Sequence, residues 1–272
     1  TRYIGVTGVQ TCALPILLLT HSHHDHINGV GALLDATVKL LIQQGYPEER
    51  IRVVPNGVDT DLFAPVERQV RDQWRTHRGI PLEAPVILFF GRKQEVKGFD
   101  LYLRAMQQIL ARRSDVIAVA IGGEPRDSTA EPSFREREML RSQLTRSGRF
   151  FDFPLMDHAE LAVACAAADM AYLPSRAETQ GMMVLESMAA GCVTVSSDLG
   201  GIRESIDSGR TGYLLSDPED VGVAVACLDM LLAKPRAELD ALRTAARQAV
   251  MENFSWPAIA AKTEAIYDEV LA

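Results

Sequence analysis

From residue 85 onward, short apolar runs alternate with longer stretches that have the amphipathic pattern of helices. Six runs have the length of a strand and are apolar at nearly every position; they cover residues 86–90, 116–121, 150–153, 170–173, 193–195 and 212–215. Continuous apolarity indicates burial on both faces of a strand, which is typical of a parallel sheet covered by helices. The pattern therefore predicts an α/β fold, a doubly wound, Rossmann-like parallel sheet of about six strands.

The segments between these runs predict the covering helices. They span residues 99–113, 133–147, 158–168, 181–190 and 201–208, and two further helices are expected at 217–233 and 236–253. Right-handed crossovers bring the loops that follow parallel strands to one edge of the sheet. Ligand-binding residues are therefore expected directly after the strands.

Composition excludes several classes of protein. The 272 residues carry a net charge of −8, whereas a surface for nucleic acid or an anionic membrane needs a basic excess. No apolar run has the roughly 18 residues of a transmembrane segment, so neither a nucleic-acid partner nor a membrane span is expected. The four cysteines are far apart and lack CxxC spacing, which indicates a reducing, cytoplasmic setting.

Two carboxylates lie eight residues apart where the run at 170–173 leads into a predicted helix. Glu178 falls in the loop and Glu186 in the helix, which begins at Gly181-Met182-Met183. The first backbone N–H groups of a helix have no acceptor inside it and can bind an anion. The alternative is that both glutamates are ordinary surface acids without a function. The apolar neighbours of Glu186, however, favour a buried carboxylate with a partner.

The loop after the run at 86–90 carries both cations and glycines. Gly91-Arg92 follow the run directly, and Lys97-Gly98 end the loop. Arginine offers a planar fork of donors, lysine a compact charge, and glycine lets the backbone come close to a ligand. Alone this pattern is weak, because loops after strands often carry solvated cations.

Together, in order and separation, the two motifs resemble the donor-binding, C-terminal half of a retaining glycosyltransferase of the GT4 family, which has the GT-B fold. The resemblance covers about residues 38–272. It implies that Arg92 and Lys97 stabilise the charge on the departing diphosphate, that Glu178 lies beside the donor sugar, and that Glu186 accepts hydrogen bonds from the ribose. The implied catalytic residues are Glu178, Arg92 and Lys97, and the implied donor-binding residues are Gly91, Arg92, Lys97, Glu178, Gly181, Met182, Met183 and Glu186.

The resemblance also implies the reaction. A hexosyl group would pass with retention from a UDP- or GDP-sugar to a glycan, lipid or small-molecule acceptor, without a cofactor or metal. Thr179-Gln180 departs from the small or aromatic pair that is common in the family, and Arg203 stands where proline is frequent, which leaves the sugar open. Because the first 37 residues contain no counterpart of an acceptor domain, we expect weak donor binding and no transfer by this chain alone.

The first residues of the chain do not fit this family. Residues 1–16 resemble a translated sequencing adapter, and we interpret them as a non-biological leader; a short strand and turn is the alternative. Residues 17–37 contain the sequence HSHHDH and resemble a fragment of the metallo-β-lactamase superfamily with its HxHxDH signature.

This histidine motif supports an alternative function, a zinc hydrolase. Its metal ligands would be His21, His23, Asp25 and His26, since imidazole and carboxylate both bind Zn²⁺. A complete site needs more ligands, and after His26 the chain has only two further histidines, His77 and His158. A third possibility is a non-catalytic module that binds a nucleotide sugar without turnover.

These interpretations divide the chain into five segments. We expect a leader at 1–16, a metallo-β-lactamase-like fragment at 17–37, an interdomain-type linker at 38–84, the Rossmann-like donor-binding domain at 85–254, and a C-terminal helix at 255–272. In the family this last helix packs on the N-terminal domain.

Overall fold

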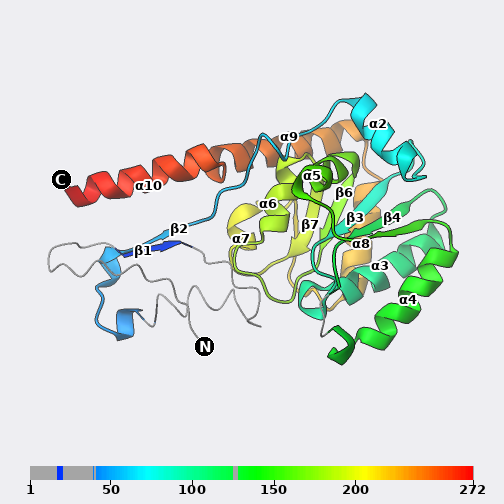
Figure 1. The fold of residues 1–272 in the computed structure, drawn as a ribbon, viewed down its shortest axis with the longest axis horizontal. Helices are drawn as coiled ribbons and strands as arrows, with labels where there is room; N and C mark the ends of the chain where they lie inside the picture. Colours follow the sequence, from blue (N-terminus) through cyan, green and yellow to red (C-terminus); the bar gives the residue numbers. More distant parts are fainter. Residues whose placement is uncertain (1–16, 21–38, 40, 125–127, 272) are drawn as a thin grey trace.

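The computed structural model describes residues 17–20, 39, 41–124 and 128–271, and its centre is a parallel sheet (Figure 1). Six strands lie in the order β5-β4-β3-β6-β7-β8. They are β3 (Val86–Phe90), β4 (Ile117–Ile121), β5 (Phe150–Phe153), β6 (Met170–Leu173), β7 (Val193–Ser197) and β8 (Tyr213–Leu215). The predicted doubly wound α/β fold is confirmed.

Helices cover both faces of this sheet (Figure 1). On one face α3 (Phe99–Arg112) contacts α4 (Phe134–Arg146) and α8 (Val221–Leu232). On the other face α5 contacts α2 and α6, and α6 contacts α9; these helices are α2 (Arg68–His77), α5 (His158–Ala167), α6 (Met182–Ala189) and α9 (Arg236–Asn253). Every residue of β3, β4, β6 and β7 is buried, as continuous apolarity predicts for strands with two covered faces.

Two of the expected helices differ from their predicted bounds by several residues at one end. The helix expected from 217 begins at Val221, because Asp220 and not Asp217 caps it by accepting from the Val223 N–H at 3.1 Å. Asp217 instead accepts from the Glu219 N–H at 2.9 Å, which forms a turn before the helix. The helix expected at 201–208 is the single turn α7 (Ile202–Ser205).

Short 3₁₀ turns lie in the segments between the strands and helices. They are η1 (Glu48–Arg50), η2 (Glu95–Lys97) and η3 (Ser128–Ala130). The turn η2 lies between β3 and α3, within the loop that carries the predicted cations.

A second, two-stranded sheet lies apart from the first. Strand β1 (Leu17–Thr20) pairs in parallel with β2 (Ile51–Val54), with Leu17 opposite Ile51. Helix α10 (Trp256–Leu271) continues from α9 and runs out beside β2, where Arg52 and Glu269 form a 2.6 Å ion pair (Figure 1). The expected leader at 1–16 and residues 21–37 lie outside the described residues.

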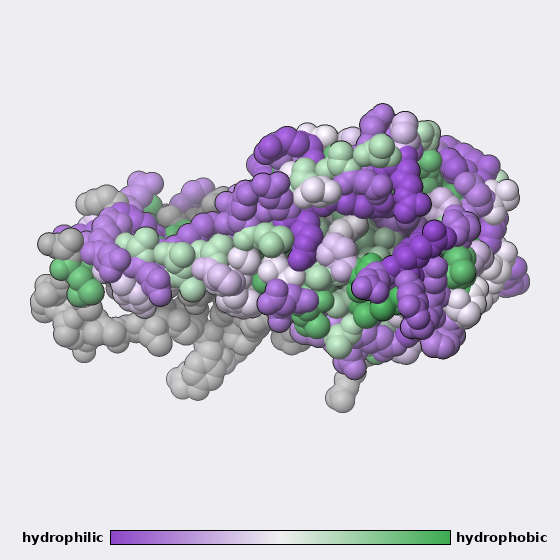
Figure 2. All heavy atoms as spheres, turned by 90° about the horizontal axis from the view of Figure 1, so that it is seen from above, coloured by the Kyte–Doolittle hydropathy of each residue, from purple (hydrophilic) through white to green (hydrophobic). Residues whose placement is uncertain are grey.

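Helix α10 forms a protruding arm with a mixed surface, on which apolar side chains stand among hydrophilic ones (Figure 2). Ile259 is buried near the start of the helix, whereas Leu271 is 82% exposed near its end. Trp256 and Tyr267 are also exposed. Within the described part of the chain, every helix is too short or too polar to cross a bilayer.

Candidate functional site

The chain changes direction within the sheet between β3 and β6. From β3 it continues outward through β4 and β5, and then returns to β6 and continues the other way through β7 and β8. Open α/β sheets bind ligands in a crevice outside the carboxyl ends of the strands at such a switch point, so this is where a ligand is expected. The loop at 91–98 follows β3 and the loop at 174–181 follows β6, and these two loops carry the predicted site residues.

The two loops touch through their glycines. A Cβ atom at Gly91 would lie 2.4 Å from the sulfur of Met183, so Gly91 brings the end of β3 against the start of α6. A Cβ atom at Gly98, which has φ of 71°, would lie 1.8 Å from the carbonyl oxygen of Pro174. The sequence predicted Gly91 as a donor contact, and the structure shows that both Gly91 and Gly98 allow close packing between the two loops and the start of α6.

Lys97 and Glu178 form an ion pair between the two loops. The Lys97 Nζ lies 2.6 Å from the Glu178 Oε2, and the two side chains are only 16% and 12% exposed. The predicted phosphate-binding cation and the predicted sugar-side carboxylate are therefore direct neighbours, from loops 81 residues apart in sequence.

Arg176 holds the two loops in this arrangement. Its guanidinium donates to both carboxylate oxygens of Asp100, at 2.6 and 2.8 Å, and to the backbone oxygen of Glu95 at 2.6 Å. The backbone N–H of Arg176 donates to the backbone oxygen of Val96 at 2.9 Å. Asp100 is 1% exposed, so this bidentate pair is the charge compensation for a buried carboxylate. Arg176 was not among the residues predicted for the site, although it lies only two residues before Glu178.

Helix α6 begins at the crevice. Gly181 precedes it with φ of 75°, and the first internal hydrogen bond runs from the Val184 N–H to the Gly181 oxygen at 2.8 Å. The amides of Met182 and Met183 therefore have no acceptor inside the helix, as the sequence predicted.

Glu186 lies one turn further along α6. It shares a face of the helix with Met182 and Met183, at spacings of four and three residues. The side chain is partly buried, and burial raises the pKa of its carboxyl group from 4.5 to about 7. No protein partner for its carboxylate is found among the described residues, so the expected buried acid is present but not the expected partner.

The remaining cations of the first loop have different surroundings. Arg92 follows Gly91 directly and is partly exposed. Lys93 is 3% exposed, and its Nζ donates to the Asp152 Oδ1 at 2.5 Å and to the Phe153 oxygen at 2.7 Å. Lys93 therefore ties the end of β3 to β5 and is already neutralised, a role that sequence reasoning did not anticipate.

The alternative function, a zinc hydrolase, depends on the histidine motif near the start of the chain. The proposed metal ligands His21, His23, Asp25 and His26 lie outside the described residues, and the residues that are described hold no cluster of three metal-binding side chains.

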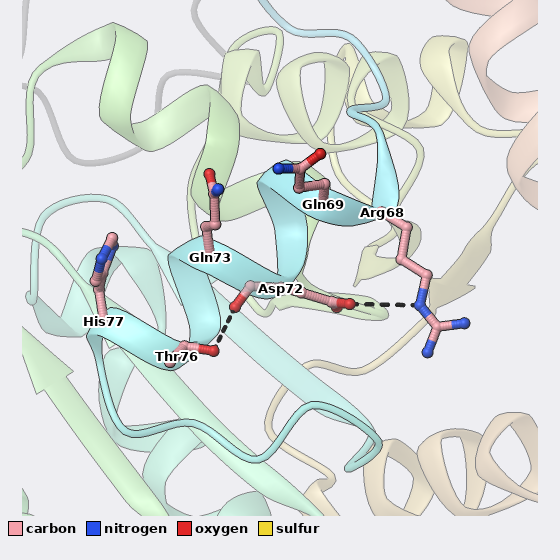
Figure 3. A pocket seen from close by; sticks show the side chains of 6 residues that line it. All are labelled: Arg68, Gln69, Asp72, Gln73, Thr76 and His77. Carbon is pink, nitrogen blue, oxygen red and sulfur yellow. Dashed lines mark hydrogen bonds and ion pairs between the residues drawn. The ribbon is translucent and has the colours of Figure 1, made fainter.

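A shallow pocket lies along α2. It is lined by Arg68, Gln69, Asp72, Gln73, Thr76 and His77, all from that one helix (Figure 3). Arg75 of the same helix donates to the Ala167 oxygen and to Asp169, directly before β6. The pocket is therefore at the amino ends of the strands, opposite the crevice.

The sheet order and its covering helices are those of the Rossmann-like domain of GT-B glycosyltransferases. A family model described as "Glycosyl transferases group 1" matches residues 84–233, more than half of the chain, so the chain belongs to this family.

Individual relatives agree with this assignment. The chain is 34% identical over 224 residues to D-inositol 3-phosphate glycosyltransferase 2 of Catenulispora acidiphila, covering 80% of this chain and 50% of that protein. Sucrose-phosphate synthase from Thermosynechococcus elongatus superposes with a TM-score of 0.70 at 26% identity, covering 86% of this chain and 56% of that one. Anabaena HepE, solved in complex with UDP and glucose, superposes with a TM-score of 0.73 at 20% identity, covering 86% of this chain and 61% of that one. The chain thus spans about half the length of the curated relative that it matches.

Proposed function

We propose that this chain is the donor-binding part of a retaining glycosyltransferase that uses a UDP- or GDP-sugar. The observation that supports this most strongly is the pairing of Lys97 with Glu178 beside the start of α6, at the switch point of the sheet. A cation, a carboxylate and unbonded helix amides at one place match the phosphate and sugar ends of such a donor.

The chemistry assigned to the first loop is charge stabilisation. An ammonium group has three donors, and Lys97 uses one of them on Glu178, so the others can bind diphosphate oxygens. Arg92 and the amides of Gly181, Met182 and Met183 would complete the anion site. When the sugar leaves, these fixed charges and dipoles stabilise the negative charge on the diphosphate without a metal.

The carboxylates have separate tasks in this proposal. Glu178, held by Lys97, would lie beside the sugar and keep the ammonium oriented. Glu186 would accept hydrogen bonds from the ribose, and its ionised form is the better acceptor. Since its pKa is about 7, donor binding should strengthen as pH rises from 6 to 8.

The comparisons support this donor class. HepE was solved with UDP and glucose, and the curated relative is a glycosyltransferase of inositol phosphate. We favour UDP over GDP on this basis, and we expect a glycan, lipid or small-molecule acceptor. The buried free thiols of Cys165 and Cys192 fit the cytoplasmic setting that the sequence suggests.

Calorimetric titration with UDP and UDP-glucose tests this proposal. Wild type should bind saturably, and Lys97→Ala should weaken binding about tenfold or more, because a charge-assisted contact to phosphate is lost. Lys234→Ala is the matched control, since that lysine pairs with Glu238 on the surface and should leave affinity unchanged. Equal affinity of wild type and Lys97→Ala would refute the assignment.

A further inference from the structure

Gln180 connects the donor loop to the linker that precedes the domain. Its Oε1 accepts from the Asn56 N–H at 2.6 Å, and its Nε2 donates to the Asn56 oxygen at 2.7 Å. The side chain is 8% exposed, and both of its polar atoms are used on the backbone of a single residue 124 positions away. Both ends of this buried side-chain amide are therefore held by the backbone of the linker.

The backbone at Gln180 is also fixed from the other side. The Gly201 N–H donates to the Thr179 oxygen at 2.8 Å, and a Cβ atom at Gly201 would lie 2.9 Å from the Cα of Gln180. Gly181, the next residue, sets the start of α6. A shift of the linker at Asn56 would therefore be passed to the first amides of α6.

The linker itself is attached to the beginning of α10. The Val58 N–H donates to the Phe254 oxygen at 2.8 Å, and a Cβ atom at Gly57 would lie 2.5 Å from the indole ring of Trp256. Residues 56–58 are thus held between Gln180 on one side and the junction of α9 with α10 on the other.

We infer that Gln180 is a positioning residue that couples the linker at residues 56–58 to the donor site at the start of α6. The inference rests on the proposed function, because it requires a nucleotide to bind there. Binding of the diphosphate at the α6 amides fixes the Gln180–Gly181 backbone, which in turn tightens both hydrogen bonds to Asn56. Since coupling between two sites is reciprocal, loosening the hydrogen bonds to the linker must weaken nucleotide binding by the same factor.

Amide hydrogen exchange with and without UDP tests the coupling. In wild type, saturating UDP should slow exchange in a peptide that contains residues 56–58 by about fivefold or more, the lower end of typical coupling between sites. Gln180→Met has nearly the same volume but cannot make either bond. This variant should abolish the UDP-dependent slowing of amide exchange and weaken the affinity for UDP by a similar factor.

Two further variants separate coupling from a general loss of structure. Gln180→Glu keeps an acceptor for the Asn56 N–H and should restore part of the slowing. Gln143→Met, which removes an exposed glutamine of α4, should behave as wild type.

The outcomes distinguish the two proposals. If wild type fails to bind UDP, the proposed function is wrong and the coupling falls with it. If UDP binds but exchange at 56–58 is unchanged, or if Gln180→Met keeps the full slowing, the coupling alone is refuted.

Discussion

At the scale of single residues, the burial of Glu186 makes the stability of the protein depend on pH. The folded state raises the pKa of this carboxyl group from 4.5 to about 7, so between these values it binds more protons than the unfolded chain does. Stability contributed by the protonated group is therefore lost as pH rises through this window. A carboxylate kept here at a cost in stability is what a ligand-binding role would require.

Replacement of Glu186 by glutamine tests this directly. Relative to wild type, Glu186→Gln should gain stability between pH 5 and pH 8, by up to about 3 kcal/mol, because a neutral amide carries no ionisation cost. Urea unfolding at both pH values measures the gain. Glu252→Gln, on the exposed face of α9, is the control, and an equal response of both variants would contradict the account.

Arg176 makes a second prediction at this scale. Arg176→Met should destabilise the protein by about 3 kcal/mol, because it leaves the Asp100 carboxylate buried without its bidentate partner. Arg203→Met should cost less than about 1 kcal/mol, since Arg203 pairs with Asp198 while 67% exposed. Chemical denaturation compares the two variants, and similar losses would show that burial of the Asp100 pair is unimportant.

The sequence predicted the positions of some of these residues but not the partners of others. Lys97 and Glu178 were predictable because each follows a strand that must end at the same edge of the sheet. The partners of Arg176, Lys93 and Gln180 were not, because a side chain's partner depends on which loops the topology brings together. Gln180 was visible only as a departure from the family pattern.

At the scale of elements, the first loop depends on the close approach of α3 to the end of β6. Gly98, directly before α3, has a left-handed backbone and no space for a Cβ beside Pro174. Gly148 has nearly the same φ, 70°, but nothing lies within 4 Å of its missing Cβ. An alanine at Gly148 would therefore introduce backbone strain alone, whereas an alanine at Gly98 would add a steric clash with Pro174.

Gly98→Ala should therefore lower stability by several kcal/mol, on the order of 3 or more, whereas Gly148→Ala should cost about 1 kcal/mol from backbone strain alone. Thermal unfolding measures both. Comparable melting temperatures for the two variants would mean that the approach of α3 to Pro174 is looser than described.

The elements themselves followed from apolar patterning. Strands β3, β5 and β6 and helix α9 have the predicted bounds, because buried runs and amphipathic periods are local properties. Helix α8 began later than expected because two aspartates, Asp217 and Asp220, competed for the cap, and sequence alone does not decide between them.

At the scale of the whole molecule, residues 56–58 and α10 lie beyond the six-stranded sheet and are attached to it by a few long-range contacts. Their positions relative to the domain come from the Gln180–Asn56 and Val58–Phe254 contacts, which join residues far apart in sequence. Composition and periodicity predicted a helix at the end of the chain but contain no information about these contacts.

The central claim is that the nucleotide binds at the crevice between the loops after β3 and β6. The most direct test is an amide chemical-shift map recorded by NMR during titration with UDP. We predict that the largest changes fall on residues 91–98 and 181–183. Changes concentrated on α2 around Asp72 and His77, or spread evenly over the protein, would contradict the account.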